Sequence, residues 1–241
     1  MVDPFGALAT ARYDGLALSL YLPLGPVSGY DAQIKDLRRE HAGALANGDR
    51  LRALDRETSR IRRVLDELPG LRKPVAIFSS EPANLLQTVR LRDDVQAQLW
   101  IDDRLHLEPL RRQLEQHPPA LIALVDQEHA RIFSVILAEA EEVADLAGRP
   151  VKRHRQGGRS TKRLQRHEEE QAHANLKVAA EWLARQDPTG SRRLYVAGPP
   201  LARGTFKRYL PKRLQEAIRA EVAAPLSASP TELIEKIGDA T

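Results

Sequence analysis

The chain has 241 residues, of which 42% are hydrophobic and 29% are charged. This balance is typical of a globular protein with a packed core and excludes a disordered chain. The absence of cysteine excludes disulfides and thiolate metal sites. No apolar run approaches the roughly 20 residues of a membrane helix, and the first ten residues lack a secretory signal pattern, so we expect a cytoplasmic protein without a membrane partner. The formal net charge of +4 is a weak indication of a nucleic-acid partner.

The first half of the chain alternates strand and helix patterns. Two segments with helical spacing, residues 31–46 and 50–68, are separated by Asn47-Gly48-Asp49 and predict an antiparallel helical hairpin. His117-Pro118-Pro119 interrupts the pattern, and we place a domain boundary there. The other elements expected before it are strands at 16–22, 73–79, 89–91 and 96–101 and a short helix at 108–116.

The second half opens with two apolar runs, 120–125 and 130–137, that predict a β-hairpin. The further elements expected are a strand at 141–146, a long amphipathic helix at 162–185, a strand at 193–197, and helices at 211–224 and from Pro230. This order predicts an α/β protein with two α/β domains in sequence. We assign residues 1–117 to the first domain and 118–225 to the second, and 226–241 to a linker or the start of a third domain.

Positive charge is concentrated in residues 149–167, here called the basic segment, which run from the end of the predicted third strand of the second domain into the start of its long helix. Gly157-Gly158 lies inside it, and Glu168, Glu169 and Glu170 follow at once as a solvated first-turn cluster. Arginine and lysine in such a segment neutralise nucleic-acid phosphates, although a flexible connector is the plainer interpretation of the glycines. The segment has no acid and carries eight cations: Arg149, Lys152, Arg153, Arg155, Arg159, Lys162, Arg163 and Arg166.

Several segments, in the same order along the chain, resemble the archaeal and eukaryotic class 1 peptide chain release factor family. They are residues 18–23 (LSLYLP), 75–79 (VAIFS), 99–110 (LWIDDRLHLEPL), 121–133 (LIALVDQEHARIF), 154–166 (HRQGGRSTKRLQR) and 194–198 (LYVAG). The resemblance is to a bacterial branch of this family, related to Pelota, Balon and the quality-control peptidyl-tRNA hydrolases. It implies an N-terminal release-factor-like domain followed by a ribonuclease-H-like middle domain.

The resemblance also implies a site and partners. In the family a Gly-Gly-Gln loop enters the peptidyl transferase centre beside the acceptor end of peptidyl-tRNA, and Gly157 and Gly158 match its glycines. Glycines allow the backbone to approach a substrate closely. We therefore expect Gly157 and Gly158 to be catalytic if the chain hydrolyses the ester. The implied partners are ribosomal RNA, peptidyl-tRNA and, through a third domain, a translational GTPase. The residues expected to contact RNA are Lys152, Arg153, Arg155, Arg159, Lys162, Arg163 and Arg166.

The sequence departs from the family at its functional motifs. Arg159 stands in place of the glutamine, and Ser160 stands where the quality-control hydrolases place theirs. The hairpin turn lacks the Asn-Ile-Lys-Ser motif, and Leu99, Ile101 and Leu105 replace the Tyr-x-Cys-x-x-x-Phe motif, so we expect no stop-codon reading. Two mechanisms stay open: a codon-independent peptidyl-tRNA hydrolase, or a non-hydrolytic A-site factor of rescue or hibernation, similar to Pelota or Balon. The missing glutamine favours the second.

Two other functions were considered, a metal site and a nuclease-like module. His154, His167 and His173 do not share a helical face or complete a ligand set, so we expect no metal and no cofactor. An RNA-binding or nuclease-like module outside the ribosome is the alternative from another class. A nuclease of the ribonuclease-H-like kind needs clustered carboxylates, and its candidates are Asp126, Glu139, Glu141 and Glu142.

Overall fold

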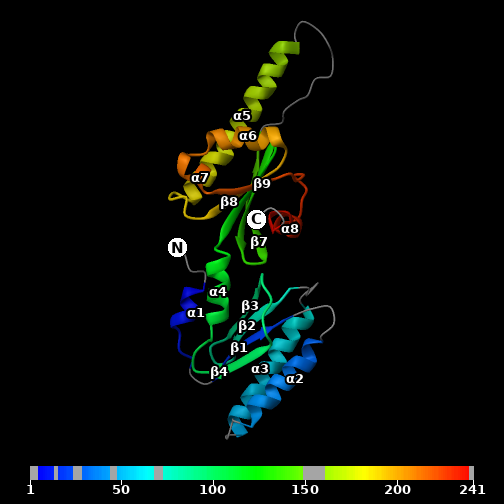
Figure 1. Cartoon of the computed structure of the whole chain (residues 1–241), viewed down its shortest axis with the longest axis vertical. Coiled ribbons are helices and arrows are strands. Elements are labelled where there is room, and N and C mark those ends of the chain that lie inside the picture. Colours follow the sequence, from blue (N-terminus) through cyan, green and yellow to red (C-terminus); the bar gives the residue numbers. More distant parts are fainter. Residues whose placement is uncertain are drawn as a thin grey trace. The chain divides into compact units, whose positions relative to one another are not determined.

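The computed structural model describes residues 5–13, 16–23, 29–43, 48–67, 73–148 and 161–238, without the side chains of Ala7 and of residues 161–168. The chain divides into two compact units, Met1–His117 and Pro118–Thr241. Each unit is built on one β-sheet with helices packed against it, which confirms the predicted α/β class (Figure 1). None of the helices in the described ranges combines the length and hydropathy that a bilayer crossing requires.

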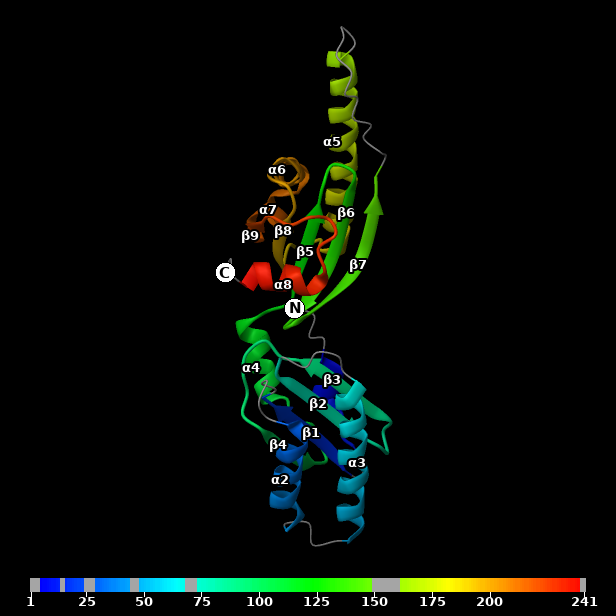
Figure 2. The same cartoon turned by 90° about the vertical axis from the view of Figure 1, so that its right-hand side faces the viewer.

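The first unit contains a four-stranded antiparallel sheet in the order β3-β2-β1-β4. The hairpin of two long helices packs on one face of this sheet (Figure 2). Leu18, Leu20 and Leu22 alternate toward that face because successive side chains of a strand point to opposite sides. The elements are α1 (Gly6–Thr10), β1 (Ala17–Leu22), α2 (Tyr30–Ala42), α3 (Gly48–Glu67), β2 (Val75–Ser80), β3 (Leu85–Arg90), β4 (Gln98–Asp102) and α4 (Glu108–Gln116).

A buried carboxylate joins the helical hairpin to this sheet. Glu57 of α3 is 1% exposed and accepts hydrogen bonds from the Ser79 hydroxyl and the Glu81 backbone N–H. Arg60, one turn along α3, lies 3.4 Å from the same carboxylate. A buried charge is tolerated only when its partners replace water. This group of contacts therefore fixes where α3 lies on β2.

The second unit contains a five-stranded mixed sheet in the order β7-β6-β5-β8-β9. Strands β5, β6 and β7 are antiparallel neighbours, while β5, β8 and β9 run parallel. Helices α5, α6 and α7 pack on one face, and α8 packs on the other. The elements are β5 (Ala120–Val125), β6 (His129–Ile136), β7 (Glu139–Ala147), α5 (Thr161–Gln186), β8 (Arg193–Ala197), α6 (Pro200–Tyr209), α7 (Lys212–Glu216), β9 (Ile218–Val222) and α8 (Pro230–Gly238).

Several stretches differ from the sequence prediction. Helix α1 was not predicted, and β3 spans Leu85–Arg90 where a strand at 89–91 was expected. The helix predicted at 211–224 ends at Glu216 in α7, and Ile218–Val222 instead forms β9, so its second half was wrong. Leu214, Ala217 and Ile218 have helical spacing, but β9 pairs in parallel with β8, and that distant pairing outweighs local propensity. Helix α6 was not predicted, although a proline at its first position is a common start signal.

The segment after residue 225 packs on the sheet of the second unit. Leu233 and Ile237 of α8 lie in one buried cluster with Ile122, Phe133 and Tyr195. Arg131 of β6 donates to the carbonyl oxygens of Leu226 (2.9 Å) and Ala228 (3.1 Å), and it also pairs with Glu142. The residues expected to be a linker or the start of a third domain therefore contribute to the core of the second unit.

Candidate functional site

The predicted Gly-Gly loop lies outside the residues that the structure describes. Lys152, Arg153, Arg155, Gly157, Gly158 and Arg159 are outside them. The backbone of Lys162, Arg163 and Arg166 belongs to the first turns of α5, but their side chains are not among those described. The assignment of these residues to RNA contacts and catalysis stays a prediction. The structure describes the two elements that flank this loop, which we call its stems: the end of β7 and the helix α5.

Helix α5 is the second stem and the longest element of the chain. At about 1.5 Å per residue its 26 residues span roughly 39 Å. Among its described side chains, Ala172, Leu176, Ala180 and Leu183 are buried in the core, whereas Glu169 and Glu170 are exposed. The N-terminal turns of α5 extend beyond the edge of the sheet in both views (Figures 1 and 2). The described contacts of α5 with the core thus lie in its C-terminal part, from Ala172 onward.

The first stem is clamped by a side chain of α5. The Asn175 amide donates to the Gln127 carbonyl oxygen (3.1 Å), in the turn between β5 and β6. The Gly148 N–H donates to the Glu128 carbonyl oxygen (2.7 Å) in the same turn. A Cβ at position 148 would overlap the Asn175 side chain, so only glycine fits there without a shift. Asn175 therefore fixes the end of β7 relative to α5.

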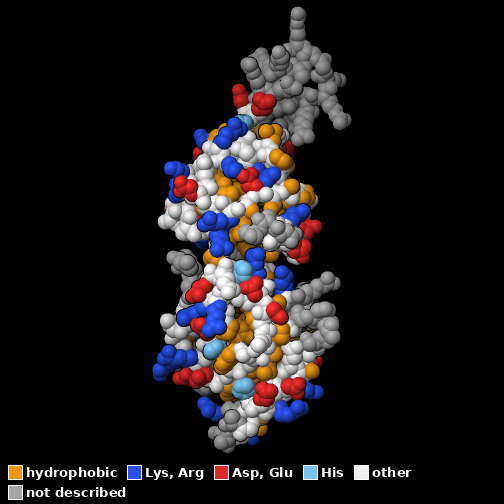
Figure 3. All heavy atoms as spheres, in the orientation of Figure 1, with side chains coloured by type: hydrophobic (Ala, Val, Ile, Leu, Met, Phe, Trp, Pro, Cys, Tyr) orange, Lys and Arg blue, Asp and Glu red, His pale blue; other side chains and the backbone are white. Residues whose placement is uncertain are grey.

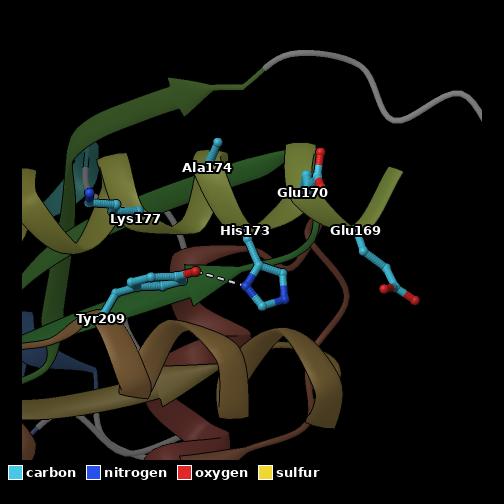
Figure 4. Close-up of a pocket in the computed structure, with 6 residues that line it drawn as sticks. All are labelled: Glu169, Glu170, His173, Ala174, Lys177 and Tyr209. Carbon is cyan, nitrogen blue, oxygen red and sulfur yellow. Dashed lines mark hydrogen bonds between the residues drawn. The ribbon is translucent and has the colours of Figure 1, made fainter. Parts of the chain in front are cut away.

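A shallow open hollow of about 500 Å³ lies beside α5, where the last turn of α6 meets it (Figure 4). The His173 Nδ1 atom lies 2.7 Å from the Tyr209 hydroxyl, and the two rings meet edge to face with centroids 5.9 Å apart. Glu169, Glu170 and Lys177 complete the polar lining. In the sequence analysis His173 was considered only as a metal ligand and rejected. Its contact with Tyr209 was not predicted, because the two residues are 36 positions apart in the sequence.

A second hollow, of about 650 Å³, is lined by α5 and by the end of β7. Gly148 and Asn175 line it together with the apolar side chains of Leu146 and Val178. Val178 is 56% exposed, although the neighbouring Leu176, Ala179 and Ala180 are buried. Both hollows are open, so neither has the enclosed geometry of a small-molecule catalytic site.

The carboxylates considered for a nuclease do not converge. Asp126 accepts from the backbone N–H groups of Glu128 (2.7 Å) and His129 (2.6 Å) and so forms the β5–β6 turn. Glu139 pairs with Ile136 at the opposite end of β6, and Glu142 is bound to Arg131. Within the part of the chain that the structure describes, no group of three His, Asp or Glu side chains could hold a metal ion. These residues give the nuclease interpretation no support.

The first unit carries a packed aromatic group on the sheet face opposite the helical hairpin. The Trp100 and His106 rings stack with centroids 4.0 Å apart, and Tyr21 meets Trp100 edge-on. The Tyr21 hydroxyl donates to the His106 carbonyl oxygen (2.9 Å), and burial raises the pKa of Tyr21. The Ser19 hydroxyl accepts from the His106 N–H (2.8 Å). These contacts hold the segment before α4 on the sheet and are structural.

Comparison with models of known protein families shows which family the chain belongs to. Residues 106–241 match the model of a family described as bacterial archaeo-eukaryotic release factor family 10. The chain belongs to this family. The match covers more than half of the chain and includes all of the second unit, so the resemblance seen in the sequence is confirmed. No curated protein matches the chain.

Comparison with solved structures gives matches of low sequence identity and low TM-score. A crystal structure of the archaeal translation termination factor aRF1 matches with 20% identity and a TM-score of 0.41, over 97% of this chain and 67% of that one. The Thermoplasma acidophilum Pelota protein matches with 14% identity and a TM-score of 0.34, over 71% of this chain and 49% of that one. Archaeoglobus fulgidus Pelota matches with 19% identity and a TM-score of 0.32, over 69% of this chain and 46% of that one.

Proposed function

We propose that the chain acts in translation on the ribosome, and that its basic segment contacts ribosomal and transfer RNA beside the acceptor end of peptidyl-tRNA. The observation that carries this proposal is the family match, because residues 106–241 include the whole basic segment and both of its stems. The charge of the segment supports it, since eight cations without an acid attract RNA phosphates.

The stems support the proposal mechanically. A segment that reaches a recessed RNA site has to be carried beyond the body of its domain. The N-terminal turns of α5 extend past the sheet, and the C-terminal half of the helix is buried. Asn175 fixes the other stem at Gly148. The scaffold therefore suits presentation of a loop on a rigid arm.

Within this function we propose a factor that occupies the A site in rescue or hibernation and leaves the ester intact. Ester hydrolysis needs a positioned water and a donor for the developing oxyanion. Arg159 has no carboxamide to place that water, but its guanidinium suits a phosphate. The second candidate is a codon-independent peptidyl-tRNA hydrolase, which Gly157-Gly158 favours because backbone amides alone could orient a water.

Co-sedimentation with ribosomes at several salt concentrations tests the proposal. The variant with Arg153, Arg155, Arg159 and Arg163 changed to Ala should bind more weakly and with a flatter salt dependence, by about 0.7 to 0.9 in slope per lost phosphate contact. The matched control changes the same four residues to Lys, which keeps the charge. Equal binding of the Ala variant and the wild type would refute the proposal.

The same ribosomes, loaded with labelled formyl-methionyl-tRNA, separate the two candidates. We expect little single-turnover release by the wild type on stop or sense codons, and more release by Arg159→Gln. Fast release by the wild type that Gly158→Ala abolishes would favour the hydrolase. Release only on stop codons would contradict the assignment of the first domain.

A further inference from the structure

A second group of cations lies at the opposite end of α5 from the basic segment. Arg185 belongs to the last turn of α5, Lys212 and Arg213 to α7, and Arg192 to the turn between α5 and β8. Arg193 and Arg219 lie at the starts of β8 and β9. We call this set the basic end: Arg185, Arg192, Arg193, Lys212, Arg213 and Arg219.

Short contacts bring these elements together. The Arg213 guanidinium lies 3.4 Å from the Ala184 carbonyl oxygen, which places α7 beside the last turn of α5. Gly190 has a φ of +67°, and a Cβ there would lie 2.9 Å from the Arg213 carbonyl oxygen, so the turn packs closely on α7. The Leu194 N–H donates to the Ala217 carbonyl oxygen (2.9 Å), which joins the starts of β8 and β9.

The turn that carries Arg192 is held by a buried carboxylate. Asp187 is 3% exposed and accepts from the N–H groups of Ser191 and Arg192, each at 3.1 Å. Burial would raise the pKa of Asp187, but these donors and the Thr189 hydroxyl outweigh it and hold the pKa below its usual value. The turn is thus fixed before any ligand arrives, which lowers the entropy lost on binding.

Few carboxylates oppose the basic end. Asp187 is occupied by its own turn, and Glu216 lies 3.8 Å from Lys212, with which it pairs. On the face of the second unit that Figure 3 shows, Lys and Arg side chains (blue) lie at several places, with Asp and Glu side chains (red) among them. The potential at the basic end is therefore positive, and it favours an anionic ligand.

The composition of the basic end selects among anionic ligands. Arginine dominates it, and the guanidinium fork matches the oxygens of a phosphate. In the described residues the exposed large hydrophobic side chains are Val143, Val178 and Leu201, and none of them belongs to the basic end. A membrane or an apolar protein partner would need such side chains. A polyphosphate backbone needs none.

We propose that the basic end is a second RNA-binding surface, which takes the phosphates of structured RNA and is separated from the basic segment by most of the length of α5. This inference deepens the proposed function and rests on it for the choice of RNA as the polyanion. Two RNA contacts on one rigid helix would fix the direction of α5 as well as its position. Binding through the two together is stronger than through either one.

Fluorescence anisotropy with a short labelled RNA duplex tests this surface without the ribosome. The starting protein carries Arg153, Arg155, Arg159 and Arg163 changed to Ala, so that the basic segment does not dominate. Adding Arg185→Ala, Arg192→Ala and Arg219→Ala should weaken binding at least about tenfold and reduce the salt slope by about 0.9 per lost contact. No hydrogen bond described above uses these three guanidinium groups, so the fold should survive.

The matched control removes three exposed cations of the first unit, Lys35, Arg104 and Arg111, from the same starting protein. We expect it to bind the duplex within about twofold of its parent, because only net charge has changed. Equal effects of the two triple variants would overturn the proposal, and so would an equal loss of binding to a poly-glutamate peptide. If the wild type fails to bind ribosomes while its duplex binding still depends on Arg185, Arg192 and Arg219, the result would count against the proposed function alone.

Discussion

The two halves of α5 differ in what holds them. The C-terminal half buries Leu176, Ala180 and Leu183 in the core, and Asp187 then fixes the turn that follows. In the N-terminal half the described side chains of Glu169 and Glu170 face solvent. The difference indicates that one part of the helix contributes to the stability of the fold, while another part carries the residues proposed to contact RNA. Substitutions of the exposed Glu169 and Glu170 should have little effect on folding, whereas substitutions of the buried Leu176, Ala180 and Leu183 should destabilise the second unit.

The largest effect should come from Leu183→Ala. Leu183 is fully buried, and a leucine-to-alanine change in a packed core costs about 2–5 kcal/mol of unfolding free energy. Urea unfolding measures it. The chain has two tryptophans, Trp100 in the first unit and Trp182 in α5, so Trp100→Phe leaves Trp182 fluorescence as a reporter of the second unit.

Val178→Ala is the matched control on the same helix. Val178 is 56% exposed, and we expect a change within about 0.5 kcal/mol. Similar losses for Leu183→Ala and Val178→Ala would contradict the assignment of Leu183 to the core and of Val178 to the exposed side of the same half. A loss for Glu169→Ala as large as that for Leu183→Ala would show that the N-terminal half is also a stabilising element.

A smaller effect should come from Asp187→Asn, which removes the charge that the turn after α5 binds. The loss should be about 1–3 kcal/mol near neutral pH, since backbone donors lose a charged acceptor. The folded pKa of Asp187 lies below its unfolded value, so its contribution is present above about pH 4 and is lost as pH falls through the folded pKa.

Unfolding free energy measured between neutral and acidic pH tests this dependence. The wild type should lose stability relative to Asp187→Asn as the pH falls, so that the two curves converge. Glu232, whose pKa is also lowered by its bonds to Ser229, titrates in both proteins and cancels in the difference. Parallel curves over the whole range would show that the Asp187 charge does not hold the turn.

The smallest effect concerns the boundary between the two halves, where Asn175 meets Gly148. Gly148→Ala should cost about 1 kcal/mol, because the new Cβ displaces the Asn175 side chain and its bond to Gln127. In an Asn175→Ala background the same change should cost much less, since the obstacle is gone. A double-mutant cycle measures the coupling. Additive effects would mean that Asn175 does not clamp the end of β7.

The predictable elements were those whose pattern is local. The spacing of Ala172, Leu176, Ala179, Ala180 and Leu183 predicted α5, and the apolar run 120–125 predicted β5. Both elements carry their own periodicity, because each buries one face or is buried throughout. The family resemblance was also readable, since the order of short segments survives where single motifs have changed.

Features made by distant residues could not be read from the sequence. Strand β9 forms because it pairs in parallel with β8. Glu57 can be buried because the Ser79 hydroxyl and the Glu81 N–H donate hydrogen bonds to its carboxylate. The His173–Tyr209 contact and the basic end have the same origin. Each joins groups from separate elements, and a one-dimensional pattern does not contain the distance between them.

Helix α8 has a practical consequence for work with shortened forms of the protein. It covers Ile122, Phe133 and Tyr195, and Arg131 ties down the two carbonyl groups that lead into it. A version cut after residue 225 would leave this apolar face open to water, and such faces associate with one another. Expression of the second unit alone should therefore run through Gly238, and a purification tag at that end needs a spacer that leaves Ile237 buried.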